Sequence, residues 1–141
     1  MRNVVLIILY DAQKRFLLQH RTSDAQLLPD HWAFFGGGIK AGETPKEALY
    51  RETREELNYT PKSPKLVLEQ DFREGAVSGR LHIYIEVFRG DTSELKLQEG
   101  QGWGWYNETE LDRLKMISRD KKIINFIATY LKNEECAQAK Q

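Results

Sequence analysis

Three glutamates stand at positions that a helix would bring onto one edge: Glu52, Glu55 and Glu56. At about 100° per residue, they fall within an arc of roughly 100°. Like charges this close repel each other, and the repulsion grows where the helix edge is shielded from water. Hard divalent cations such as Mg²⁺ and Mn²⁺ take oxygen ligands and commonly combine carboxylates with substrate phosphates. The three acids therefore predict a cation site that binds a phosphorylated ligand.

A second interpretation of these acids is a solvated surface helix, in which Arg51 and Arg54 neutralise part of the charge. The segment in front of the helix favours the metal site instead. Gly36, Gly37 and Gly38 follow an aromatic run, and successive glycines let main chain approach a ligand closely. A glycine loop that leads into an acidic helix is suited to hold a metal and the phosphates that it bridges.

Capping signals set the bounds of this helix. Pro45 suits the first helical position and Thr44 suits the cap before it. Asn58 suits the left-handed residue that follows a helix. These signals predict a helix from Pro45 to Leu57.

The segment of residues 37–59 resembles the signature of the Nudix hydrolases. That signature reads G, five residues, E, seven residues, R, E, an aliphatic, any residue, E, E, any residue, G and an aliphatic. Thr53 stands where an aliphatic is usual, Asn58 replaces the second glycine, and Tyr59 fills the last slot. None of these changes removes a metal ligand. The matching positions are Gly37, Glu43, Arg51, Glu52, Glu55 and Glu56.

The resemblance implies roles for the matching residues. It places the three helix glutamates around Mg²⁺, with Mn²⁺ as the alternative, and the main-chain carbonyl of Gly37 as a further ligand. Glu43 and Arg51 match structural positions, where the first steadies the loop and the second orients the carboxylates. The family has no single general base: the first helix glutamate serves in some members, here Glu52, and a later acid serves in others, for which the sequence offers Glu99.

The activity implied by the resemblance is metal-dependent hydrolysis of a diphosphate linkage in a nucleoside diphosphate derivative. The compact size and the loop that contains Glu99 favour a MutT-like nucleoside triphosphate pyrophosphohydrolase, including one that removes oxidised nucleotides. A nucleotide sugar or ADP-ribose is the alternative substrate. A Nudix module that binds a nucleotide without cleaving it is the alternative from a different class.

Four further residues are candidates for contacts with the substrate. Arg21 and Lys40 are candidate phosphate contacts, since Lys40 lies in the glycine loop and Arg21 ends an expected strand. Trp32 and Phe35 stand next to the glycines and are candidates to line the pocket. The competing interpretations are that the two basic side chains are only solvated at the surface and that the two aromatic rings pack in the core.

Length, charge and cysteine use restrict the function class. The 141 residues predict one domain over residues 1–133, followed by a polar tail over 134–141. With 21 basic and 21 acidic residues the net charge is zero, so a nucleic acid polymer or a membrane is not indicated as partner, and the resemblance implies a small nucleotide. The single cysteine, Cys136, indicates a reducing, cytoplasmic compartment. We expect a monomer or a homodimer.

Hydrophobic patterning predicts the remaining elements. A helix capped by Asn107 and another capped by Ser118 follow the last strand, and a frayed tail begins at Asn133. The order of strands and helices predicts an α+β fold with a mixed sheet, which the family has as an α/β/α sandwich. The expected strands are residues 4–10, 15–21, 32–35, 65–72, 81–89 and 102–106.

Overall fold

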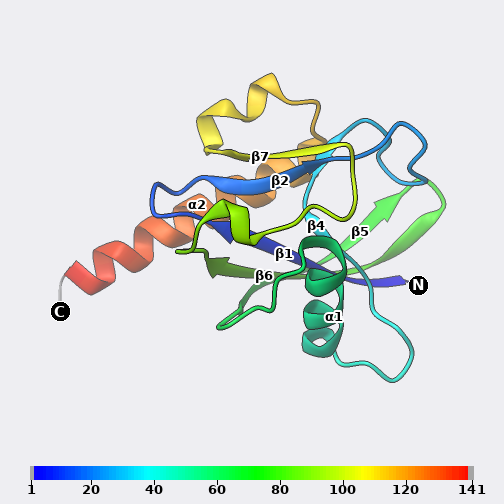
Figure 1. Ribbon diagram of the computed structural model, residues 1–141, viewed down its shortest axis with the longest axis horizontal. Coiled ribbons are helices and arrows are strands. Elements are labelled where there is room, and N and C mark those ends of the chain that lie inside the picture. The colour runs from blue at the N-terminus through cyan, green and yellow to red at the C-terminus, as the bar shows by residue number, and fades with distance from the viewer. Residues whose placement is uncertain (1, 140–141) are drawn as a thin grey trace.

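The computed structural model describes residues 2–139 and contains a seven-stranded sheet with one main helix on each face (Figure 1). The helices are α1 (Pro45–Leu57) and α2 (Ser118–Ala139), with the 3₁₀ helices η1 (Thr92–Glu94) and η2 (Glu108–Arg113). The strands are β1 (Arg2–Tyr10), β2 (Phe16–His20), β3 (Trp32–Ala33), β4 (Phe35–Gly38), β5 (Lys65–Glu74), β6 (Val77–Val87) and β7 (Gly102–Tyr106).

The sheet is mixed, and two different strands pair with one edge of β1. On one side β1 pairs with β6 in parallel, and β5 continues the sheet antiparallel to β6. On the other side β2 pairs with the last residue of β1, Tyr10. Along the same edge β4 pairs with the first half of β1, through Leu6↔Gly36 and Val5↔Gly37. Because β2 and β4 share this edge, the glycine strand is held against β1 where the sheet opens.

The side chains of β1 alternate between two hydrophobic layers, as expected for a strand that is covered on both faces. Val5, Ile7 and Leu9 pack with the buried residues of α1. Ile8, with Leu6 beside it, packs with the buried residues of α2. The expected α+β fold with a mixed central sheet is therefore confirmed.

The predicted bounds of α1 are confirmed. Thr44 accepts a hydrogen bond from the Glu47 N–H at 3.1 Å, and Glu47 accepts one from the Thr44 N–H at 2.9 Å. This reciprocal capping box satisfies two main-chain donors at the helix start. At the other end Asn58 is left-handed with φ 52°, and its N–H donates to the Arg54 carbonyl. The site helix is therefore defined by local sequence signals.

The C-terminal helix differs from the sequence expectation. Ser118 is the first residue of α2 rather than the cap before it, and the helix continues through Asn133 to Ala139 instead of fraying. Glu134 forms an ion pair with Lys65 at 2.6 Å, which supports this last part of the helix. Residues 134–139 thus continue α2, and the rest of the expected tail lies outside the described residues. Within residues 2–139 no helix is both long and apolar enough to cross a membrane.

Candidate active site

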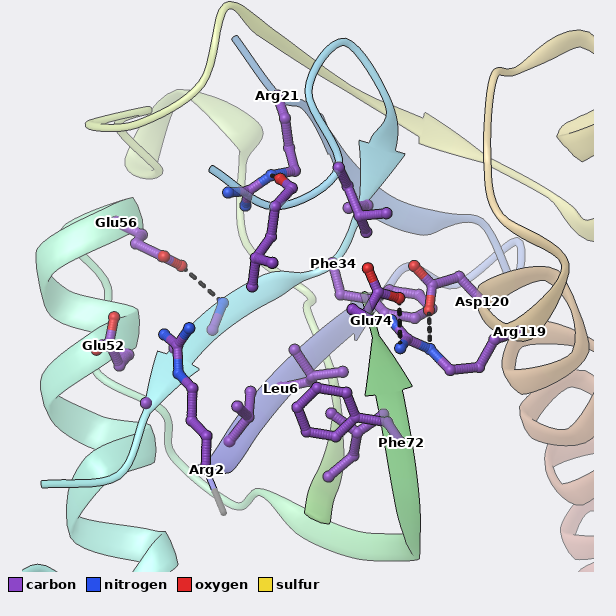
Figure 2. Close-up of a pocket in the computed structure, with 18 of the residues that line it drawn as sticks. Arg2, Leu6, Arg21, Phe34, Glu52, Glu56, Phe72, Glu74, Arg119 and Asp120 are labelled. Atoms are coloured by element: carbon purple, nitrogen blue, oxygen red, sulfur yellow. Dashed lines mark hydrogen bonds and ion pairs between the residues drawn. The ribbon is translucent and has the colours of Figure 1, made fainter. Parts of the chain in front are cut away.

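A cavity of about 320 Å³ lies between α1, the glycine strand β4 and the start of α2 (Figure 2). Glu52 and Glu56 of α1 line one end of it. Glu74, Arg119 and Asp120 line the other end. One cavity therefore joins a cluster of carboxylates to a second polar group that comes from β5 and α2.

Glycine allows β4 to lie directly against the acidic helix. Glu56 is 2% exposed, and its Oε2 accepts a hydrogen bond from the Gly36 N–H at 2.8 Å. Gly36 has φ +143°, and a Cβ there would lie 2.0 Å from the Val5 carbonyl oxygen. A Cβ on Gly37 would lie 2.6 Å from the Glu52 carboxylate. A side chain at position 37 would push the strand away from Glu52, and one at position 36 would push it away from β1.

Glu99 lies against Glu56, although it comes from a separate loop. The Gln98 N–H donates to the Glu56 carbonyl, and the Gln101 N–H donates to the His20 carbonyl, both at 2.8 Å. These two bonds hold the Glu99 loop (residues 96–101) between α1 and β2. Burial, then the charge of Glu99 and a hydrogen bond with it, raise the pKa of Glu56 to about 10. Glu56 therefore holds a proton at neutral pH.

Arg51 joins the acidic helix to the glycine strand. Its Nε and Nη2 donate to the Glu43 carboxylate at 2.7 and 2.8 Å, and its Nη1 donates to Glu52 at 2.7 Å. Nη2 also donates to the Gly38 carbonyl at 3.0 Å. The hydrogen bonds from Arg51 and from the Lys40 N–H lower the pKa of Glu43 to about 2. Glu43 therefore stays ionised at neutral pH and keeps the loop tied to Arg51.

We expect Arg51→Met to lower the free energy of unfolding by about 2 kcal/mol, because charged hydrogen bonds to Glu52 and to the Gly38 carbonyl are lost together. Urea unfolding followed by circular dichroism measures the change. Arg54→Met is the matched control, since Arg54 is an exposed arginine of the same helix, and it is expected to cost less than about 0.5 kcal/mol. Equal losses in the two variants would contradict the bridging role of Arg51.

The carboxylates are not arranged as a finished cation site. Glu55 is 58% exposed and lies 3.6 Å from Arg51, whereas Glu52 is paired with Arg51. Among residues 2–139 no three His, Cys, Asp or Glu side chains are grouped closely enough to hold a metal as they stand. The available donors are nevertheless all oxygen and mutually repulsive, which suits Mg²⁺ or Mn²⁺. Arg51 engages only Oε1 of Glu52, which leaves Oε2 for a cation, whereas Glu56 must lose its proton to bind one.

The other residues expected to contact a substrate lie in different places. Arg21 lines the cavity. Trp32 stacks on His20 with ring centroids 4.9 Å apart. Phe35 is buried in the core beneath α1, and Lys40 is exposed. The described residues that line the cavity do not include Trp32, Phe35 or Lys40.

Several residues of the cavity have no distinguishing signal in the sequence. Arg2 lines it beside Gly38. At the far end the Arg119 side chain bridges two acids, with its Nη1 2.7 Å from Glu74 and its Nε 3.1 Å from Asp120 (Figure 2). Asp120 is 1% exposed, and burial raises its pKa to about 6 against the opposing effect of Arg119. This end of the cavity therefore offers buried hydrogen-bonding groups opposite the carboxylates.

A family model described as the NUDIX domain matches residues 1–126. The nucleoside triphosphatase NudI of an Enterobacter species is 52% identical over 42 residues, which is 30% of this chain and 30% of that protein. An RNA pyrophosphohydrolase of Acinetobacter baylyi is 38% identical over 73 residues, 51% of this chain and 40% of that protein. The chain thus spans less than half the length of these two curated relatives.

The fold is similar to that of a solved structure over nearly its whole length. The crystal structure of a MutT protein from Methanosarcina mazei superposes with a TM-score of 0.80. The alignment covers 93% of this chain and 95% of that chain, at 18% sequence identity. This likeness is one of fold.

Proposed function

The chain belongs to the Nudix family, and from that premise we propose that it is a metal-dependent pyrophosphohydrolase acting on a nucleotide. The observation that carries the proposal is the meeting of three carboxylates at one end of a single cavity: Glu52, Glu56 and Glu99. The acids come from α1 and from a distant loop, and their repulsion is unfavourable unless a proton or a cation offsets it. A site for a divalent cation accounts for their being brought together.

Hydrolases of this family generally require divalent metal ions, and we propose Mg²⁺, with Mn²⁺ as a substitute. Glu52 and Glu56 would hold the ion from α1, and Glu99 would face it from its loop. Gly37 lies against Glu52, so its carbonyl is a candidate for a further oxygen ligand. When bound, a divalent cation neutralises charge on the diphosphate oxygens and makes a water molecule easier to deprotonate. Glu55 is a weaker candidate ligand because its side chain is more than half exposed.

We assign the role of proton acceptor to Glu99. Glu52 is already engaged by Arg51 at 2.7 Å, and Glu56 is buried and bonded to the Gly36 N–H. Glu99 is exposed while lining the same cavity, so an attacking water can reach it. In this arrangement Glu56 keeps the glycine strand in place, and Glu99 removes the proton from the water as it attacks phosphorus.

The two ends of the cavity differ in chemistry, and this difference would orient the substrate. Phosphates would lie at the carboxylate end, where Arg2 and Arg21 line the wall and offer positive charge. The nucleoside would lie toward Arg119 and Asp120, which provide buried hydrogen-bonding groups. A nucleoside triphosphate extends from one end to the other, so we propose a nucleoside triphosphate as the substrate and a monophosphate plus pyrophosphate as products.

The 5′ end of a triphosphorylated RNA is a second candidate, favoured by the similarity to a protein named RNA pyrophosphohydrolase. The chemistry at phosphorus is the same. The zero net charge of the chain supplies no general attraction for the rest of a polymer, which favours the free nucleotide.

A substrate panel tests the proposal. The purified protein is incubated with Mg²⁺ or with EDTA and with nucleoside triphosphates, their oxidised forms, ADP-ribose, nucleotide sugars and a short triphosphorylated RNA. Chromatography identifies the products. We expect monophosphate and pyrophosphate from a triphosphate, only with Mg²⁺. Nucleotide binding without turnover of any compound would support a binding module instead.

Asp120→Asn is expected to raise KM for the preferred nucleotide by about 10-fold and to change kcat by less than about threefold, because loss of one buried polar contact costs about 1–3 kcal/mol. Steady-state kinetics measure both constants. Asp112→Asn is the control, since the Asp112 side chain is 97% exposed on η2. A drop in kcat with an unchanged KM would contradict a binding role for the far end.

A further inference from the structure

Gln19 is a buried amide that is only partly hydrogen-bonded. It lies on β2 with 1% of its surface exposed. Its Nε2 donates to the Phe34 carbonyl at 3.0 Å, but its Oε1 has no hydrogen-bond partner anywhere in residues 2–139. An unpaired buried oxygen costs about 1–3 kcal/mol. Stability alone therefore does not explain an amide at this position.

On one side the Gln19 amide fixes the segment that leads into the glycine strand. Phe34 comes two residues before Gly36, whose N–H donates to Glu56. The bond from Gln19 to the Phe34 carbonyl thus holds the main chain just ahead of the donor that orients Glu56.

On the other side the Gln19 amide supports the Glu99 loop. Gly100 follows Glu99 directly and has φ +89°. A Cβ on Gly100 would lie 2.9 Å from Gln19 Oε1 and 3.0 Å from the His20 carbonyl oxygen. The main chain next to Glu99 therefore lies directly on the Gln19 amide, and any side chain at position 100 would move the loop away.

We propose that Gln19 is a positioning residue for the Glu56–Glu99 carboxylate pair. The Gln19 nitrogen bonds to the segment before Gly36, and its oxygen faces the residue after Glu99. It thereby sets the separation of two carboxyl groups that are carried by different parts of the chain. The catalytic consequence rests on the proposed function, whereas the geometric consequence does not.

Gln19→Met keeps the length of the side chain and removes both polar atoms. We expect it to weaken Mn²⁺ binding, measured by electron paramagnetic resonance, by about 10-fold, as is typical when a group that orients metal ligands is lost. We expect kcat to fall about 10-fold while KM for the nucleotide changes less than twofold. The melting temperature should stay within a few degrees of the wild type, because one hydrogen bond and one unpaired oxygen are removed together.

Two further variants keep the test decisive if Gln19→Met folds poorly. Gly100→Ala displaces the loop from the opposite side of the same contact and is expected to show the same losses in Mn²⁺ affinity and kcat. Tyr59→Phe is the control, because it removes a hydrogen bond to the buried Glu86, which lies outside the cavity. It is expected to leave both quantities unchanged.

A double-mutant cycle separates positioning from a general structural defect. If Gln19 acts through Glu99, Gln19→Met should lower kcat less than twofold in a Glu99→Gln background. Losses that multiply, or a wild-type kcat and Mn²⁺ affinity in Gln19→Met, would overturn the proposal. Failure of the wild-type protein to turn over any nucleotide would overturn the proposed function instead, and the Mn²⁺ titration would still test the role of Gln19.

Discussion

Replacing Glu56 with glutamine is expected to lower turnover by about a thousandfold, because the change removes a cation ligand from the centre of the site. The substitution keeps the shape of the side chain, and the amide oxygen can still accept the hydrogen bond from Gly36. It also replaces a buried acid by a neutral group that needs no proton. We therefore expect the free energy of unfolding in EDTA at neutral pH to be unchanged or higher.

Glu86→Gln is the matched control for this prediction. Glu86 is also a buried glutamate, 5% exposed, but it accepts hydrogen bonds from the Lys62 and Ser63 N–H groups at 2.8 and 2.6 Å, outside the cavity. It is expected to lose stability and to keep turnover, the reverse of Glu56→Gln. Steady-state kinetics and urea unfolding of both variants measure the contrast. Turnover close to wild type in Glu56→Gln would show that the Glu56 carboxylate is not needed for the reaction.

The affinity for a divalent cation is expected to rise steeply with pH. Glu56 has a pKa raised to about 10 by burial and by Glu99, so at neutral pH it carries a proton that a cation must displace. Displacement of one proton tightens cation binding by about tenfold per pH unit below that pKa. Calorimetric titration of Mn²⁺ between pH 6 and 8 in buffers of different ionisation enthalpy measures both the slope and the proton released. A Kd independent of pH, with no proton released, would contradict a proton on Glu56.

The same pKa predicts how stability depends on pH without a cation. The folded state holds the Glu56 proton between the ordinary glutamate pKa and the raised one, while the unfolded state has released it. Stability is therefore highest below the ordinary value and is lost as pH rises toward the raised value. Glu56→Gln should flatten this decline, and Asp120, whose pKa is also raised, is present in both proteins and cancels in the comparison.

Local signals predicted the site helix, because the residues that start and end it are neighbours in sequence. Thr44 with Glu47, Pro45 and Asn58 each act within one turn of the helix, and α1 has the predicted bounds. The end of α2 was not predictable in this way. Polar residues after Asn133 read as a frayed tail, yet an ion pair between Lys65 of β5 and Glu134 supports the helix there from a distant strand.

The residues at the far end of the cavity were not predictable for a related reason. Glu74 ends β5, whereas Arg119 and Asp120 begin α2, and only the packing of α2 against the sheet brings them together. Trp32 and Phe35 stand in sequence beside the glycines, but their strands place them elsewhere. Trp32 stacks on His20, and Phe35 packs with the buried residues of α1. Proximity in sequence to a glycine loop does not decide which face a side chain takes.

Glu99 was a candidate only through the resemblance to the Nudix family, because nothing in its own segment distinguishes it from a solvated acid. In the structure, hydrogen bonds from Gln98 to the Glu56 carbonyl and from Gln101 to the His20 carbonyl bring it against Glu56. The contact depends on main-chain pairing between distant segments, which composition and periodicity do not encode.

Anomalous X-ray diffraction from crystals that contain Mn²⁺ and a slowly hydrolysed nucleoside triphosphate analogue tests the central claim most directly. We expect Mn²⁺ between the carboxylates of Glu52 and Glu56, with Glu99 facing it, the phosphates of the analogue against it and its base toward Asp120. Mn²⁺ bound away from these carboxylates in the presence of the nucleotide would contradict the account.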